Sequence, residues 1–313
     1  MHPALMGLIG DALPWLLEAE NSSVRYWALV DVLDRPADDP DVLQARAAIA
    51  GQPLVKELFN LQQPGGYWGE DESKPYTARG AVAVLSLLHM LGVTPDGRTA
   101  AGCGSLLRNC QHECGGLSLS GKTRSGIFPC TTGEHLPMLV YFGFGSDPRV
   151  QKAFTLLIED MSTADALDCG RYQHRDCLWG AIAALNGLAV LPVELQTAAS
   201  RKVVQNLAEA LLDAPYDFQG EHKRWLTFGV PRIWDLLSAL KALAAHGYAG
   251  DRRFMPLLER VMQLQDEQGR WKCGPVSRTW PIEKRGQPSK WVTLDALRML
   301  KMAGLAVAAA NCV

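Results

Sequence analysis

The stretch Gln62-Gln-Pro-Gly-Gly-Tyr-Trp68 decides the fold, because it returns near the other end of the chain as Gln265-Asp-Glu-Gln-Gly-Arg-Trp271. Both copies read Gln-x-x-x-Gly-x-Trp. A weaker copy, Gln111-His-Glu-Cys-Gly-Gly-Leu117, keeps the Gln and the Gly but has leucine in place of Trp. A motif that recurs along a chain is the signature of a repeat architecture.

The spacing of the copies gives the length of the repeat. Gly66 and Gly115 are 49 positions apart, and Gly115 and Gly269 are 154 apart, which is room for three further units of about fifty residues. Weaker turn sequences at 168–170 and 217–220 fall within that interval. A chain of 313 residues could hold two domains by length alone. The regular spacing favours a single domain over residues 1–313, with a short disordered tail at 305–313.

Each turn is followed by an apolar segment of helical period and then by a more polar one. The apolar segments, which we expect to be buried helices, are residues 24–33, 76–91, 135–144, 177–191, 232–247 and 291–304. The amphipathic segments, which we expect to cover them, are residues 3–19, 41–62, 97–111, 148–161, 192–212 and 252–265. Start signals for the buried helices are Ser22 or Ser23, Ser73 with Pro75, Thr131 or Thr132, and Ser289.

No segment shows the alternation expected of strands, so the prediction is an all-α protein. Six buried and six amphipathic helices in alternation close most simply into an α/α toroid, with the buried helices in an inner ring. An open solenoid would need polar caps at both ends, and the sequence shows none.

Composition excludes several classes of function. A net charge of −2 argues against binding nucleic acid through a basic surface. No apolar run reaches the roughly 20 residues of a transmembrane helix. The start of the chain lacks the features of a signal peptide, which predicts a cytoplasmic protein. The eight cysteines are then more easily explained as thiols or metal ligands than as disulfides.

The Gln-x-x-x-Gly-x-Trp copies resemble the repeat of squalene cyclases and protein prenyltransferase β subunits. In that class Gln and Gly shape the turn and Trp packs on the next outer helix. The resemblance implies a toroid whose central cavity binds an isoprenoid or another apolar ligand. Residues 130–133, 174–180 and 289–294 are also similar to a small, single-toroid prokaryotic branch of the class.

The acidic motifs of that class are missing. Cyclases that protonate an alkene carry Asp-x-Asp-Asp, whereas Asp295 stands alone between Leu294 and Ala296. Enzymes that ionise a diphosphate carry Asp-Asp-x-x-Asp, and the nearest approach is residues 38–41, in a turn between helices. The resemblance therefore leaves open whether the protein is an enzyme.

Polar and aromatic residues cluster where the buried helices are expected to begin. We expect a substrate site from Arg25, Tyr26, Tyr76, Arg79, Trp179, Trp225, Arg232, Lys290 and Trp291. Arginines at helix starts can hold a diphosphate or carboxylate, and aromatic faces stabilise cations. The alternatives are that the arginines pair with Glu134, Asp176 and Asp235, and that the aromatics are plain core. Glu134 and His135 are candidate acid–base partners, with Asp176 and Asp295 as further catalytic candidates.

Cys169, His174 and Cys177 have the spacing of a short metal-binding loop, and Cys130 at the preceding helix start completes four ligands. Four soft or borderline ligands are what zinc requires. The order Asp176-Cys177-Leu-Trp179 is also similar to part of the zinc site of protein prenyltransferases. An iron–sulfur cluster is the alternative, because Cys110 and Cys114 add two thiols. A further alternative is that the cysteines are simply buried.

Three functions follow from the sequence. The first is a terpenoid cyclase-like or prenyltransferase-like protein that binds or transforms an isoprenoid-like substrate. The second is a zinc-thiolate enzyme that acts on thiols or peptides. The third is a non-catalytic toroid that binds a ligand or a partner protein.

Overall fold

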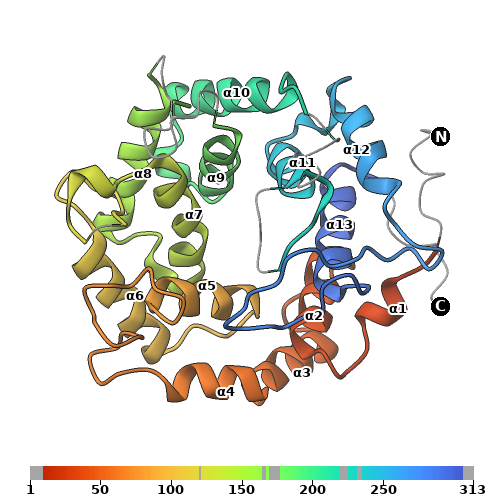
Figure 1. Ribbon diagram of the computed structural model, residues 1–313, viewed down its shortest axis with the longest axis horizontal. Coiled ribbons are helices and arrows are strands. Elements are labelled where there is room, and N and C mark those ends of the chain that lie inside the picture. Colours follow the sequence, from red (N-terminus) through yellow and green to blue (C-terminus); the bar gives the residue numbers. More distant parts are fainter. Residues whose placement is uncertain are drawn as a thin grey trace. The chain divides into compact units, whose positions relative to one another are not determined.

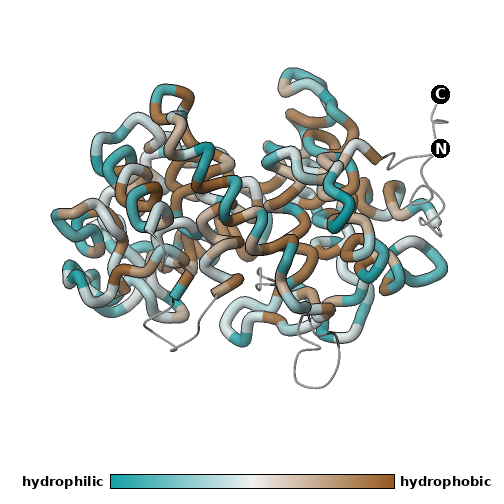
Figure 2. The backbone as a smooth tube through the Cα atoms, turned by 90° about the horizontal axis from the view of Figure 1, so that it is seen from above, coloured by the Kyte–Doolittle hydropathy of each residue, from teal (hydrophilic) through white to brown (hydrophobic). Residues whose placement is uncertain are grey.

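The computed structural model describes residues 10–119, 121–163, 167–168, 177–216, 218, 225–230 and 235–305. These ranges contain thirteen α-helices, a few short 3-10 and π segments and no strand, so the all-α prediction is confirmed (Figure 1). Hydrophobic and hydrophilic stretches alternate along the chain (Figure 2). No helix within these ranges has the length and apolar character needed to span a bilayer.

The chain divides into two compact units. Unit 1 consists of Met1–Ile49 and Leu212–Val313, and unit 2 of Ala50–Leu211. A single domain over 1–313 stays a prediction, and residues 306–313 of the predicted tail lie outside the described ranges.

Unit 2 is built from three buried helices and their amphipathic partners. In chain order its helices are α4 (Pro53–Asn60), α5 (Ala81–Met90), α6 (Gly97–Cys110), α7 (Pro129–Leu139), α8 (Pro148–Met161), α9 (Leu178–Leu188) and α10 (Ala198–Leu212). Eight of the eleven residues of α9 are buried, as expected of an inner helix. The closest packing joins α7 to α9, where a Cβ added to Gly133 would lie 2.5 Å from the carbonyl oxygen of Ala183. Small side chains at this contact let two backbones approach each other.

Unit 1 brings the last repeat of the chain onto the first. Its helices are α1 (Leu13–Leu16), α2 (Ser22–Trp27), α3 (Pro40–Ile49), α11 (Leu236–Ala245), α12 (Phe254–Met262) and α13 (Lys290–Met302). Helix α13 packs against α11, α2 and α1. A Cβ added to Gly269, in the last repeat motif, would lie 2.5 Å from the carbonyl oxygen of Gly10. The last copy of the motif therefore packs against Gly10, near the start of the chain.

The Gln-x-x-x-Gly-x-Trp motifs join consecutive helix pairs. The indole nitrogen of Trp68 donates to the carbonyl of Leu58 at 2.7 Å, and its ring lies against Gly102 of α6. Gln62 Nε2 donates to the carbonyl of Arg98 at 2.8 Å. The last copy repeats the indole bond, from Trp271 to Val261, at 2.8 Å. The motif thus ties the end of one outer helix to the start of the next.

Of the four predicted helix starts, those of α2, which begins at Ser22, and of α13 are right, and those of α5 and α7 are wrong. Ser289 caps α13, as its Oγ accepts from the backbone N–H of Val292 at 3.1 Å. Helix α2 is capped by Asn21 rather than by Ser22 or Ser23. Helix α7 starts earlier than Thr131, at Pro129, whose fixed φ suits the first helical position. Helix α5 starts only at Ala81, because residues 69–80, including Ser73, form turns and bends.

Candidate functional site

Four of the predicted site residues come together in unit 2. The ring of Tyr76, from the turns before α5, meets the ring of His135 on α7 edge-on, with centroids 5.6 Å apart. Burial raises the pKa of the Tyr76 phenol, and negative charge on Cys110, Glu134 and Cys130 would raise it further. Cys130, Glu134 and His135 share helix α7, and Cys110 is the last residue of α6, the helix before it. We call Tyr76, Cys110, Cys130, Glu134 and His135 the tyrosine cluster.

The hydroxyl of Tyr76 is the unusual feature of the tyrosine cluster. It is buried, and no residue in the described ranges forms a hydrogen bond with it. A buried polar group without a partner costs about 1–3 kcal/mol, so native structures rarely leave one unexplained. The raised pKa keeps the phenol protonated at neutral pH, so its O–H is available to donate. This hydroxyl can hold the polar group of a ligand.

His135 presents one defined tautomer to the tyrosine cluster. Its side chain is 3% exposed, and burial lowers the pKa of the imidazole, which is therefore neutral at pH 7. Nδ1 lies against the carbonyl oxygen of Thr131, one turn earlier, and must donate to it. Nε2 is then the acceptor nitrogen. The hydrogen bond goes to Thr131 rather than to Glu134, whose side chain is exposed.

The proposed metal ligands fall partly outside the described ranges. Cys169 and His174 lie there, while Cys130 and Cys177 belong to the starts of α7 and α9, which pack side by side. The backbone N–H of Cys177 donates to the carbonyl of Leu167 at 2.8 Å. Among the described residues, no group of three or more His, Cys, Asp or Glu side chains is arranged to hold a metal. The four-ligand zinc site stays a prediction.

The thiols of the iron–sulfur alternative have different surroundings. Cys110 is fully buried at the end of α6, and burial raises its thiol pKa to about 12. Cys114 is half-buried on the next turn, where its Sγ lies 3.1 Å from Nδ1 of His112. Cys110 thus belongs to the tyrosine cluster and Cys114 to a separate pair.

In unit 1, the candidate Asp295 belongs to a chain of charges between helices. Its Oδ1 lies 2.6 Å from Nζ of Lys241 and 3.2 Å from Nη1 of Arg298. Arg298 also contacts Asp31 at 2.6 Å, and its guanidinium lies 4.9 Å from the centre of the Trp27 ring. All four charged side chains are at most about one-third exposed. This arrangement joins α11 and α13 to the π segment Ala28–Val32, which directly follows α2.

Asp235 is a titratable residue whose environment sequence analysis missed. It caps α11, with Oδ1 accepting from the backbone N–H of Ser238 at 2.8 Å, and only 3% of it is exposed. Burial raises the pKa of this carboxyl to about 7, and the charge of Asp295 adds to the rise. One feature of the sequence could have indicated a buried capping role for this residue, namely an Asp directly before an apolar helix. The sequence analysis names Asp235 only within the alternative that the arginines pair with carboxylates.

The remaining predicted residues have mostly structural surroundings. Arg25 pairs with Asp41 at 3.0 Å, a carboxylate that is not among the three suggested as partners for the arginines. Lys290 pairs with Glu18 at 2.6 Å. Asp176 and Arg232 lie outside the described ranges, and Arg79 is exposed.

The aromatic candidates are largely packed. Tyr26 is 6% exposed and lies against Trp27, with ring centroids 4.9 Å apart. Trp225 meets Tyr216 edge-on at 5.1 Å. Trp291 is 5% exposed, whereas Trp179 on α9 is half-buried. A ligand role for these residues stays a prediction.

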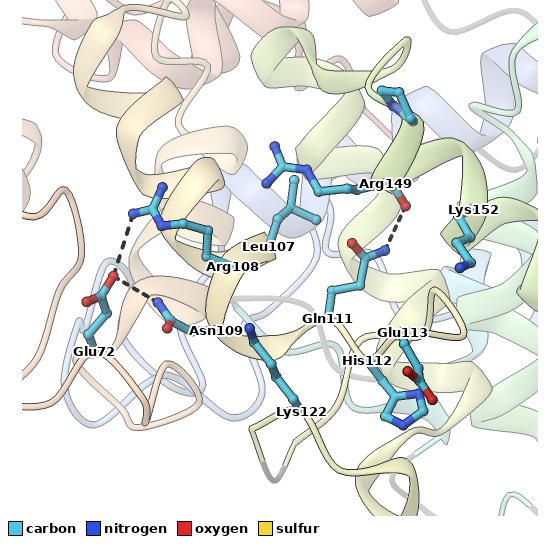
Figure 3. Close-up of a pocket in the computed structure, with 11 residues that line it drawn as sticks. Glu72, Leu107, Arg108, Asn109, Gln111, His112, Glu113, Lys122, Arg149 and Lys152 are labelled. Carbon is cyan, nitrogen blue, oxygen red and sulfur yellow. Dashed lines mark hydrogen bonds and ion pairs between the residues drawn. The ribbon is translucent and has the colours of Figure 1, made fainter.

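A cleft of about 820 Å³ lies in unit 2 at the ends of α6 and α8 (Figure 3). Its lining includes the cationic side chains of Arg108, Lys122, Arg149 and Lys152, with His112 beside them. Sequence analysis did not identify this cleft, because its residues come from two outer helices and two separate turns.

Comparison with known proteins places the fold. No family model and no curated protein matches the sequence. Among solved structures, a variant of the type II terpene cyclase MstE from Scytonema, in complex with geranylgeranyl dihydroxybenzoate, is 12% identical with a TM-score of 0.50, covering 97% of this chain and 99% of that chain. A second MstE variant with the same substrate is 14% identical (TM-score 0.48, coverage 97% and 99%). A protein from Actinoplanes is 18% identical (TM-score 0.47, coverage 91% and 90%). The chain shares the fold of the first of these, a terpene cyclase.

Proposed function

We propose that this protein binds an isoprenoid-like apolar molecule against its inner helices, in the toroid that the repeat predicts. The observation that carries the proposal is the match, over 97% of this chain and 99% of the other, to a cyclase that holds geranylgeranyl dihydroxybenzoate. That ligand combines a long apolar chain with a polar aromatic head. Within unit 1, the last repeat packs on the first.

The tyrosine cluster is the part of the proposed site that would bind the polar end of the ligand. The buried hydroxyl of Tyr76 carries a proton that no described residue accepts, and the ring of His135, whose Nε2 is an acceptor, meets the Tyr76 ring edge-on. The apolar inner helices would accommodate the chain of the ligand. A ligand bound in this way gains one or two directed hydrogen bonds in addition to apolar burial.

The experiment is a thermal-shift titration of the purified protein with farnesol, geranylgeraniol and geranylgeranyl diphosphate. Saturation at a hundred times Kd should raise the stability of the folded state by about 2.7 kcal/mol. Hexadecanol, an unbranched alcohol, distinguishes isoprenoid recognition from general lipid binding. Mass spectrometry of the same incubations detects any converted product, which would distinguish an enzyme from a binding protein.

Tyr76→Phe tests the site itself. Removing the hydroxyl should weaken binding about tenfold, the loss expected for one hydrogen bond, without lowering the stability of the unliganded protein. Tyr216→Phe is the matched control, because Tyr216 also has a buried hydroxyl that bonds to none of the residues that the structure describes, but it lies in unit 1. If no isoprenoid shifts the melting temperature, or if hexadecanol does so equally well, the proposal fails.

A further inference from the structure

The cleft of unit 2 is separate from the tyrosine cluster and has a different character. Its volume of about 820 Å³ is ordinary for a small-molecule site, and it shares no residue with the cluster (Figure 3). Leu107 and Pro148 form the apolar part of the described lining, whereas the other nine residues are polar or charged. Such a lining suits a polar ligand and offers little surface to an isoprenoid chain.

The repeat turn at residues 111–117 packs on the start of α8 and so forms the cleft. Gln111 Nε2 donates to the carbonyl of Arg149 at 2.7 Å, and a Cβ added to Gly115 would lie 2.7 Å from the carbonyl oxygen of Lys152. These contacts hold the turn against the first residues of α8. Arg149 and Lys152 are three positions apart on that helix, so their side chains leave it on the same face. Both line the cleft.

Two arginines of the cleft are held in place by carboxylates. Nε and Nη2 of Arg149 donate to Asp147 at 3.0 and 2.7 Å. Nη2 of Arg108 lies 3.6 Å from Oε1 of Glu72, which also accepts from Asn109 at 2.9 Å. A guanidinium has five N–H groups, so each arginine keeps donors that bond to no residue described by the structure. The two carboxylates orient these donors before any ligand arrives.

The two lysines of the cleft have no such carboxylate. Lys122 lies in the turns before α7 and Lys152 lies on α8, and both side chains are exposed. Neither forms an ion pair or hydrogen bond with any residue in the described part of the chain. The two ammonium groups therefore carry the uncompensated positive charge of the lining, opposed there by the exposed carboxylate of Glu113. This positive charge stands out on a chain whose net charge is −2.

We infer that this cleft binds a small, polar phosphate monoester. Lys122 and Lys152 balance the two charges of its phosphoryl group, because a lysine ammonium binds phosphate as a point charge. The spare N–H groups of Arg108 and Arg149 donate directed hydrogen bonds to the phosphoryl oxygens. A phosphate group alone leaves most of 820 Å³ empty, and the polar organic part of the ligand occupies the rest. This site is independent of the tyrosine cluster, so either site can exist without the other.

The test is calorimetric titration of the full chain with glucose 6-phosphate and glycerol 3-phosphate at constant ionic strength in chloride buffer. Glucose is the uncharged reference and sulfate is the inorganic dianion of similar shape. We expect saturable binding of a monoester, about tenfold or more tighter than that of sulfate, because the organic part adds hydrogen bonds. Glucose should not bind measurably. Vesicles of phosphatidylcholine, with and without phosphatidic acid, present the same phosphate chemistry as a lipid headgroup.

Charge variants locate the binding in the cleft. Lys122→Gln and Lys152→Gln should each weaken monoester binding about tenfold, the loss expected for one charge-assisted hydrogen bond. The matched control replaces Lys56 on α4 and Lys202 on α10 with Gln, because both are exposed lysines of unit 2 outside the cleft. Glu113→Gln removes the opposing carboxylate and should tighten binding a few-fold. A gain of affinity of this kind cannot arise from damage to the fold.

Four results would overturn the assignment. They are no binding of either monoester, equal affinity for sulfate, an equal loss in the cleft and control double variants, and no tightening in Glu113→Gln. Binding to phosphatidic acid vesicles without binding to the soluble monoesters would exclude a soluble ligand. Circular dichroism on every variant separates these results from a loss of fold.

Discussion

Nζ of Lys241 on α11 lies 2.6 Å from Oδ1 of Asp295 on α13, and both side chains are mostly buried. The pair lies between two inner helices, where the periodicity alone would have placed apolar side chains. Arg298 extends it to Asp31, so each carboxylate meets at least one cation. Buried charges persist when they are paired in this way. The geometry gives Asp295 a structural role in unit 1.

The first prediction concerns this pair. Replacing Asp295 with Asn should destabilise the fold by about 2 kcal/mol, because it leaves the Lys241 ammonium poorly compensated. Lys241→Met and the double variant complete a cycle measured by urea unfolding. We expect a coupling energy of about 1 kcal/mol between the two sites. Strictly additive effects would show that the contact does not contribute.

The second prediction concerns the pH dependence of stability. The pKa of Asp235 is raised to about 7 in the folded protein, from an ordinary value of 3.8. The folded state therefore binds a proton that the unfolded state releases between these values. Stability from the protonated form is fully present below pH 4 and is lost as pH rises through 7. At about 1.4 kcal/mol per pKa unit, the whole effect is on the order of 4 kcal/mol.

Asp235→Asn removes this titration and keeps a residue that caps helices well. We expect the variant to match the unmodified protein near pH 4 and to be more stable at pH 8. The measurement is the free energy of unfolding in urea across that range. Curves that run parallel at all pH values would contradict the raised pKa.

The third prediction concerns the packing of the Trp68 ring against Gly102 of α6. A methyl group on Gly102 would lie 2.5 Å from this ring, so Gly102→Ala should destabilise the protein by about 1–3 kcal/mol. Gly97→Ala, at the start of the same helix, is the control, because nothing lies within 4 Å of the added Cβ. The control should be neutral or slightly stabilising. Equal losses in the two variants would contradict the packing explanation, because helix propensity favours Ala over Gly at both positions.

The fourth prediction concerns metal. The sequence predicts one zinc ion per chain, held by Cys130, Cys169, His174 and Cys177. Elemental analysis of protein purified without oxygen should find it, and Cys177→Ser should lose it. Cys103→Ser, a buried thiol outside the predicted set, should retain it. Iron in place of zinc would favour the cluster alternative, and the absence of both would retire the site.

Local chemistry made the helices predictable. Repeat spacing and apolar period identified the buried helices of both units, because each depends on residues near one another in sequence. The Gln and Trp of the motif likewise bond to carbonyls of adjacent helices, as at Gln62 and Trp68. Helix starts were predicted less well. Residues 69–80 carry Ser73 and Pro75 as start signals, yet their turns delay α5 to Ala81.

The sequence predicted four of the five residues of the tyrosine cluster as site residues, but not their chemistry. Helix-start position singled out Tyr76, Cys130, Glu134 and His135, and these lie together in unit 2. Two features depended on what else packs around these residues: the Tyr76 hydroxyl has no partner within the described part of the chain, and His135 bonds to Thr131. The spacing of residues along the sequence does not encode which hydrogen-bond partners a side chain finds or lacks in the folded protein.

The sequence by itself determined that this protein is all-α, built from repeated helix pairs, and where most buried helices lie. These properties follow from short-range periodicity and from one turn motif. Only the tertiary structure decided that Asp295 is ion-paired and that Asp235 is buried and easily protonated. Burial and charge depend on neighbours brought from distant parts of the chain, and therefore the reactivity of a side chain is settled only when the chain has folded.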